Sequence, residues 1–141
     1  MHPTEPEEPT WAQNLNDHTR EKYERYKKLP DKTTLEQAVT LSHHYHSANN
    51  YVGKRMREIQ AVDVNSYPLN TMTVADVSSL EARLNGHPSH TQYVIEKLGI
   101  KDPANTRWLT LVTIYRERMG KLDEVLRQQK EEHEAQLKNV V

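Results

Sequence analysis

The stretch TTLEQAVTLSHHYHSANNYVGKRMREIQ, residues 33–60, decides the fold class because apolar or small residues recur in it at alternating spacings of three and four. This spacing averages 3.5 residues, the period of a helix that packs along another helix, whereas a half-buried strand would alternate every second residue. The residues on this seam are Leu35, Ala38, Ser42, Tyr45, Asn49, Val52, Met56 and Ile59. We therefore expect a long helix over 33–62, in which Ser42 and Asn49 are polar positions that fix the register of packing.

The last third of the chain repeats the pattern in a second long helix, which we place at 103–137. Its seam residues are Trp108, Val112, Tyr115, Met119, Leu122 and Leu126. The first half of this helix is broader than a seam, because further apolar residues lie off that line and demand burial on a second side. They are Leu109, Leu111, Ile114 and Val125. The later seam positions are polar, so we expect 129–141 to be a solvated helix end or a partner-binding tail.

Five start signals divide the chain into helices. Four of them are a hydroxyl residue followed three positions later by a residue that can bond back to its amide, the pattern of a capping box. The fifth is Asp102-Pro103, because the N–H that Pro lacks would have no partner in the first helical turn. The hydroxyl residues are Thr10, Thr33, Thr73 and Ser89. The expected helices are 10–29, 33–62, 73–85, 89–98 and 103–137.

These signals define an all-α fold of about five helices. The two long helices, 33–62 and 103–137, form a bundle or coiled-coil-like core, and the two short ones form a helix-turn-helix-like arrangement. Residues 10–128 then make a single helical domain. Residues 1–9 hold three Pro and three Glu, and we expect a disordered acidic tail there, because so little apolar area cannot offset the entropy of ordering.

The composition excludes several classes of function. The 141 residues contain no cysteine, which rules out disulfides and thiolate chemistry and favours a cytoplasmic location. No apolar run approaches the roughly 20 residues of a membrane span, so we expect no membrane partner. No nucleophile, carboxylate pair or glycine loop stands at a catalytic spacing, and we expect no enzyme activity. The chain has eight histidines, but no carboxylate completes a recognised metal site with them, and we expect neither a metal nor a cofactor.

Binding is therefore the expected function, with the last long helix as the main surface. The two long helices would reach roughly 45 and 50 Å, longer than one compact domain of this size is wide, so the overhang needs a cover. The apolar girth of the last helix favours a second copy of the chain, or another protein, as that cover. The interface residues that we expect are Trp108, Leu111, Val112, Tyr115, Met119, Leu122 and Leu126.

The alternative is a small DNA-binding regulator that dimerises through the last helix and reads DNA with residues 73–100. The second short helix would present polar side chains to a major groove, backed by basic residues of the long helix 33–62. The expected contacts are Lys54, Arg55, Arg57, Ser89, His90, Gln92 and Tyr93. The charge disfavours this reading, because residues 63–102 hold three basic residues against five acidic ones, and neutralised phosphates supply most nonspecific affinity. Either function would suit a small accessory protein of a phage or a bacterium.

Overall fold

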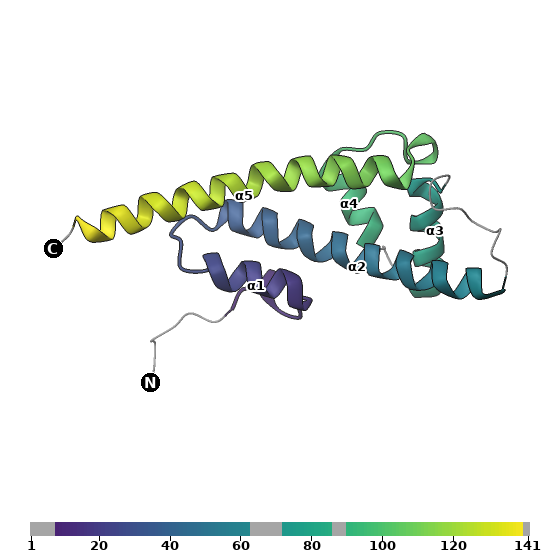
Figure 1. Cartoon of the computed structure of the whole chain (residues 1–141), viewed down its shortest axis with the longest axis horizontal. Coiled ribbons are helices and arrows are strands. Elements are labelled where there is room, and N and C mark those ends of the chain that lie inside the picture. The colour runs from purple at the N-terminus through teal and green to yellow at the C-terminus, as the bar shows by residue number, and fades with distance from the viewer. Residues whose placement is uncertain (1–7, 63–71, 86–89, 140–141) are drawn as a thin grey trace. The chain divides into compact units, whose positions relative to one another are not determined.

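The computed structural model describes residues 8–62, 72–85 and 90–139 (Figure 1). In these residues the chain is all-α, as the sequence predicts: it forms five α-helices and two 3₁₀ turns, and apart from an isolated antiparallel bridge between Thr73 and Arg107 it forms no strand. The elements are η1 (Thr10–Ala12), α1 (Asp17–Tyr26), α2 (Thr33–Val62), α3 (Val74–Asn85), α4 (His90–Leu98), η3 (Pro103–Asn105) and α5 (Trp108–Lys138). We expected a disordered tail at residues 1–9, and residues 1–7 of it lie outside the described part of the chain.

The chain divides into two compact units, and both long helices contribute to each of them. Unit 1 comprises Met1–His43 and Leu122–Val141, so it holds α1, the start of α2 and the end of α5. Unit 2 comprises His44–Lys121, with the rest of α2, the short helices α3 and α4, and the start of α5. The boundaries between the units therefore fall inside helices.

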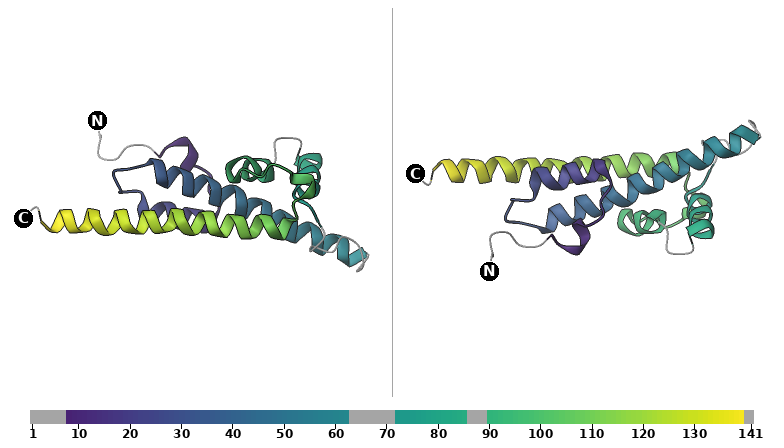
Figure 2. Two further views of the ribbon diagram at one scale, coloured as in Figure 1. Left: turned by 90° about the horizontal axis from the view of Figure 1, so that it is seen from above. Right: turned by 90° about the horizontal axis from the view of Figure 1, so that it is seen from below.

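Unit 1 packs α1 against the start of α2 and the end of α5. Tyr23 of α1 and Leu126 of α5 are buried in its core. The hydroxyl groups of Thr19 and Ser42 lie 3.1 Å apart inside this core, so each satisfies the other where water is excluded. Lys22 of α1 forms an ion pair with Asp123 of α5 at 2.9 Å, and Figure 2 shows α1 beside the later half of α5.

Unit 2 is held together by aromatic and backbone contacts. The rings of Tyr45 and Tyr115 stack with their centroids 3.6 Å apart, which joins α2 to the start of α5. Burial raises the pKa of the Tyr45 phenol, although the nearby charge of Arg116 acts in the opposite direction. The Trp108 N–H donates to the Met72 carbonyl at 2.8 Å, so the starts of α3 and α5 lie together.

The first helix begins later than the sequence predicts. Thr10 opens only the 3₁₀ turn η1, and α1 begins at Asp17. Asn14 has a φ of 60°, a left-handed conformation that Asn tolerates better than most residues and that ends helical winding. Asn16 then caps α1, because its Oδ1 accepts the Thr19 N–H at 3.0 Å. The expected helix 10–29 is therefore two separate elements.

The last helix also begins later than expected. Asp102-Pro103 opens the 3₁₀ turn η3, and α5 begins only at Trp108. The Thr106 hydroxyl donates to the Asp102 carbonyl at 2.7 Å and fixes the turn. A Pro that suits the first turn of an α-helix suits a 3₁₀ turn equally well, so the signal does not distinguish the two.

The buried face of α2 differs from the expected seam. Asn49, expected to fix the register, is exposed, and its neighbour Ala48 is buried instead. Ser42 is buried as expected, and its partner is the Thr19 hydroxyl. The side chains of Met56 and Ile59 lie outside the described part of the chain. Burying Ala48 costs no desolvation of a polar group, which explains why it replaces Asn49 on the packed face.

The start of α3 confirms the capping box that the sequence predicts. The Thr73 N–H donates to Asp76 Oδ2 at 3.1 Å, and the Asp76 N–H donates to Thr73 Oγ1 at 3.1 Å. Each side chain thus satisfies an N–H group that the first helical turn leaves without a partner.

The start of α4 is capped from another helix. Glu81 of α3 is only 1% exposed, and its carboxylate accepts the N–H groups of His90 at 3.1 Å and Thr91 at 3.0 Å. The Thr91 hydroxyl adds a third hydrogen bond at 2.8 Å. A carboxylate at a helix N-terminus is stabilised by both these donors and the helix dipole. Ser89, the expected cap, lies outside the described residues. At this helix end the Glu81 carboxylate binds where an external anion could otherwise bind.

Replacing Glu81 with Ala tests this capping. The N–H groups of α4 and the buried Thr91 hydroxyl would lose their acceptor, and we expect the free energy of unfolding to fall by about 3 kcal/mol. Urea denaturation measures this change. Glu96→Ala on the exposed face of α4 is the matched control and should change stability by less than about 0.5 kcal/mol. Equal effects of the two substitutions would show that the Glu81 contacts contribute nothing specific.

A second pair of substitutions tests the core of unit 1. Leu126 is fully buried and the adjacent Val125 is 40% exposed, although both are apolar residues of α5. We expect Leu126→Ala to lower the free energy of unfolding by about 3 kcal/mol, because it removes buried apolar area and leaves a cavity in the core. Val125→Ala should lower it by less than about 1 kcal/mol. Chemical denaturation of both variants measures the difference, and similar losses would contradict this assignment of the buried face.

Candidate functional site

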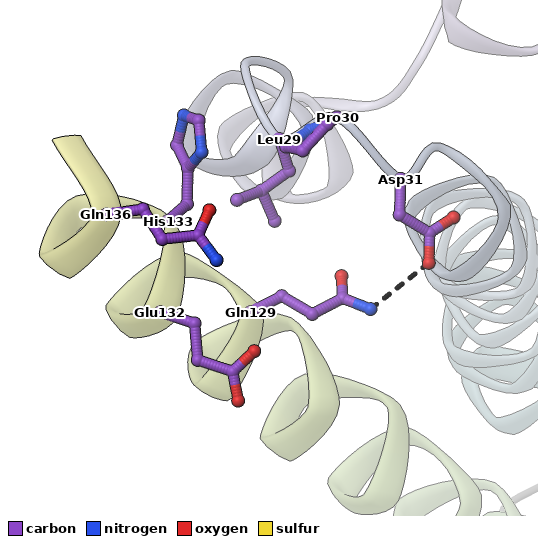
Figure 3. A pocket seen from close by; sticks show the side chains of 7 residues that line it. All are labelled: Leu29, Pro30, Asp31, Gln129, Glu132, His133 and Gln136. Carbon is purple, nitrogen blue, oxygen red and sulfur yellow. Dashed lines mark hydrogen bonds between the residues drawn. The ribbon is translucent and has the colours of Figure 1, made fainter. Parts of the chain in front are cut away.

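A surface hollow of about 160 Å³ lies in unit 1. It is formed by the turn between α1 and α2 and by one face of the last turns of α5 (Figure 3). The lining residues are Leu29, Pro30, Asp31, Gln129, Glu132, His133 and Gln136. The hollow therefore combines an apolar floor from the turn with polar groups from α5.

The turn is shaped by the end of α1. Pro30 cannot continue that helix, because it has no N–H and its ring clashes with the preceding turn. The Lys32 ammonium donates to the Leu29 carbonyl at 2.6 Å and also to the Lys27 carbonyl, so it satisfies groups that the helix end leaves without partners. Asp31 supplies an acceptor for the start of the next helix, since its Oδ1 accepts the Thr33 N–H at 2.9 Å. The side-chain acceptor at the start of α2 is therefore Asp31, where the sequence predicts Thr33.

The described residues satisfy only part of the Gln129 side-chain amide. Its Nε2 donates to Asp31 Oδ2 at 3.1 Å, and this bond fixes the orientation of the amide, because an ionised carboxylate only accepts. Figure 3 shows the nitrogen facing Asp31 and the oxygen turned to the side of Leu29 and Pro30. This Oε1 is buried and accepts no hydrogen bond from the described residues. Such an acceptor is costly when it is left without a donor, so the hollow favours a bound hydrogen-bond donor.

Two exposed apolar side chains flank the hollow. Val125 is 40% exposed and stands one helical turn before Gln129, and Leu137 is 59% exposed and stands one turn after His133. Leu137 also continues the stripe of α5 on which Leu126 is fully buried. We call the hollow together with Val125 and Leu137 the α5-end surface.

Opposite charges gather on the two segments that form this surface. Residues 24–33, around the turn, hold four basic and two acidic residues, whereas residues 131–138 of α5 hold three acidic residues and one basic residue. Lys28 and Glu132 are both exposed and take part in no ion pair within the described part of the chain. The turn is therefore a basic patch and the end of α5 an acidic one.

The side chains expected to form an association surface lie mainly inside the fold. Most of them are buried within this single chain, and the remaining two are half-buried. The buried ones are Trp108, Leu111, Tyr115, Met119 and Leu126, and the half-buried ones are Val112 and Leu122. The broad apolar surface of α5 from which we predicted association with a second copy is thus largely covered by the chain itself. Of the residues off the seam, Leu109 remains 46% exposed and Val125 40% exposed.

The residues expected to contact DNA are only partly described. Lys54 on α2 and Gln92 on α4 are exposed. The side chains of Arg55 and Arg57, and the whole of Ser89, lie outside the described residues.

His90 and Tyr93 of α4 face α2. The Nδ1 atoms of His90 and His44 lie 2.8 Å apart, a distance at which the N–H of one ring donates a hydrogen bond to the nitrogen of the other. The Tyr93 ring stacks on His44 with centroids 4.0 Å apart, and the Lys97 ammonium lies 5.5 Å from the centre of the Tyr93 ring. Both side chains therefore take part in the packing of unit 2.

Other histidines have similar structural roles. The Asn16 N–H donates to His43 Nδ1 at 3.3 Å, which ties the start of α1 to α2. Across residues 8–62, 72–85 and 90–139, no three His, Asp or Glu side chains gather closely enough to hold a metal ion. None of the helices in these ranges has the length and apolarity to cross a membrane.

Comparison of the chain with protein-family models, with curated proteins and with solved structures gave no match.

The hollow was not predicted from the sequence. Its two halves are 98 residues apart in the chain where Gln129 bonds to Asp31, and no local pattern joins them. The only signal was indirect: Gln129 and His133 are polar residues at positions where the helix seam continues. Such residues can face either solvent or a polar site, and the solvated reading is the commoner one.

A double-mutant cycle tests the packing of α4 on α2. We expect His44→Ala and His90→Ala to destabilise the protein less in combination than the sum of their single effects, by about 1 kcal/mol, because they share one hydrogen bond. Urea denaturation of the wild type, both single variants and the double variant gives this coupling energy. The control cycle pairs His90 with His133 of unit 1 and should be additive, and an additive His44–His90 cycle would contradict the contact.

Proposed function

We propose that this chain is a non-enzymatic assembly protein that associates with a second copy of itself through the α5-end surface. One observation carries the proposal: the stripe of α5 that fully buries Leu126 runs on to an exposed Leu137, beside a hollow whose buried Gln129 oxygen accepts no hydrogen bond from the residues that the structure describes. An exposed apolar side chain next to an unsatisfied polar group is the composition expected of a surface that a partner covers.

Charge complementarity supports a second copy as the partner. Each copy carries a basic patch at residues 24–33 and an acidic patch at residues 131–138. In a two-fold arrangement the basic patch of one copy faces the acidic patch of the other, and the contact occurs twice. Another protein would need a complementary pair of patches of its own.

The alternative, a DNA-binding regulator, has less support. The N-terminal N–H groups of α4, which could hold a phosphate, are already bonded to the Glu81 carboxylate. His90 and Tyr93 are engaged with His44, so they are poorly placed to reach base edges. The remaining argument for DNA binding is the basic segment around Lys54, which by itself would supply only sequence-independent affinity.

The proposal contains no catalytic step. The lining of the hollow offers His133 as a base but no Ser, Thr, Cys or Lys that could act as a nucleophile beside it. A chain without cysteine also suits a reducing compartment such as the cytoplasm.

Substitution of Leu137 tests the proposal. We expect a wild-type dimer at tens of micromolar by light scattering after size exclusion, and we expect Leu137→Glu to weaken the dimer at least about tenfold, because it would desolvate a charge next to Glu134. Raising the salt concentration should also weaken the dimer.

Leu109→Glu is the matched control, since Leu109 is a similarly exposed leucine of α5 that belongs to unit 2. It should leave the dimer intact, and circular dichroism should show both variants to be helical. A monomeric wild type would refute self-association. Dissociation by Leu109→Glu alone would place the interface elsewhere.

A further inference from the structure

We infer that the hollow receives a cationic side chain carried on an aliphatic stem, and that Lys28 of the second copy supplies it. The identity of the donor rests on the self-association proposed above, whereas the chemistry of the hollow stands without it.

The lining selects for a cation. Gln129 Oε1 accepts no hydrogen bond from the described residues, and the Asp31 carboxylate lies beside the Gln129 amide (Figure 3). Glu132 also lines the hollow and adds a second negative charge, although its carboxylate is turned away from the Gln129 oxygen. An ammonium group has three donors and no acceptor, so it can donate to the Gln129 oxygen while its charge is attracted by both carboxylates. A neutral hydroxyl would satisfy Gln129 without being attracted by the Asp31 and Glu132 carboxylates, and an anion would be repelled by them.

The same lining accommodates an aliphatic stem. Leu29 and Pro30 form an apolar floor along which the methylene groups of a lysine can pack while the charged end stays at the polar side. The volume of about 160 Å³ is much more than a single water molecule requires. None of the lining residues is Lys or Arg, and His133 is the one lining group that can itself become cationic.

Among the lysines of the turn, Lys28 is the one whose ammonium group has no partner within the described residues, so it can pair with a second copy. Lys27 pairs with Glu24 at 2.5 Å, and Lys32 donates to the Lys27 and Leu29 carbonyl groups in the turn after α1. Lys28 is exposed and directly precedes Leu29, which lines the hollow of the same copy. Because Lys28 lies beside the hollow of its own copy, a two-fold axis that passes near the hollow brings Lys28 to the hollow of the second copy.

A pair of small probes tests the chemistry of the hollow. The full-length Lys28→Met variant leaves the hollow without its proposed occupant and can be titrated with N-acetyl-lysine methylamide or with the uncharged norleucine analogue of equal stem length. The side-chain amide signals of Gln129 in nitrogen-15 spectra report binding. We expect the lysine probe to bind at least about fivefold more tightly than the norleucine probe, and we expect Glu132→Gln to remove this preference. Equal responses to the two probes, or no response to either, would refute the inference.

A charge exchange identifies the donor. Lys28→Glu and Glu132→Lys should each weaken the dimer about tenfold, and the two together should restore it, because the exchanged charges pair again between copies. Lys121→Glu, a change of an exposed lysine of unit 2, is the matched control and should have no effect.

The outcomes separate the two proposals. A dimer that tolerates both single substitutions would exclude Lys28 as the donor and leave self-association standing. A monomeric wild type whose Lys28→Met variant still prefers the lysine probe would refute self-association and support the cation site.

Discussion

The length of the two long helices is the constraint on which the rest of this structure depends. α2 has 30 residues and α5 has 31, so each extends over roughly 45 Å, more than one small core can cover. Their apolar stripes are therefore buried in sections, by α1 in unit 1 and by α3 and α4 in unit 2. Leu137 is a part of the α5 stripe that the described residues leave exposed. The α5-end surface thus has the same physical origin as the division into units.

The helical fold and the extent of α2 were predictable because periodicity is written along a continuous stretch of sequence. Helix starts were less predictable, since several residues near each start can act as a cap. The pair of Thr73 and Asp76 forms the predicted capping box, because both partners belong to the same helical turn. The prediction that the first helix starts at Thr10 was wrong, because Asn16 provides the cap from which α1 begins. The cap of α4 comes from Glu81 in another helix, and no local signal could have indicated it.

The candidate site shows a different limit of sequence reasoning. Trp108 and Leu111 are large apolar residues, and that property predicts burial without saying whether the cover belongs to the same chain or to a partner. They are buried within the chain itself. The hollow depends on Asp31 and Gln129, polar residues that each look solvated in their own segment and acquire a role only when folding brings them together. Long-range pairing of polar side chains leaves no periodic trace in a sequence.

The Glu81 carboxylate also has a consequence for the motions of unit 2. α4 has only nine residues, too few for a stable helix in isolation, and its first turn depends on acceptors provided by α3. Any fluctuation that separates α3 from α4 therefore removes the cap and exposes a buried carboxylate in the same event. The two short helices should open and close as one cooperative unit, with amide hydrogens of both exchanging with solvent at a common rate.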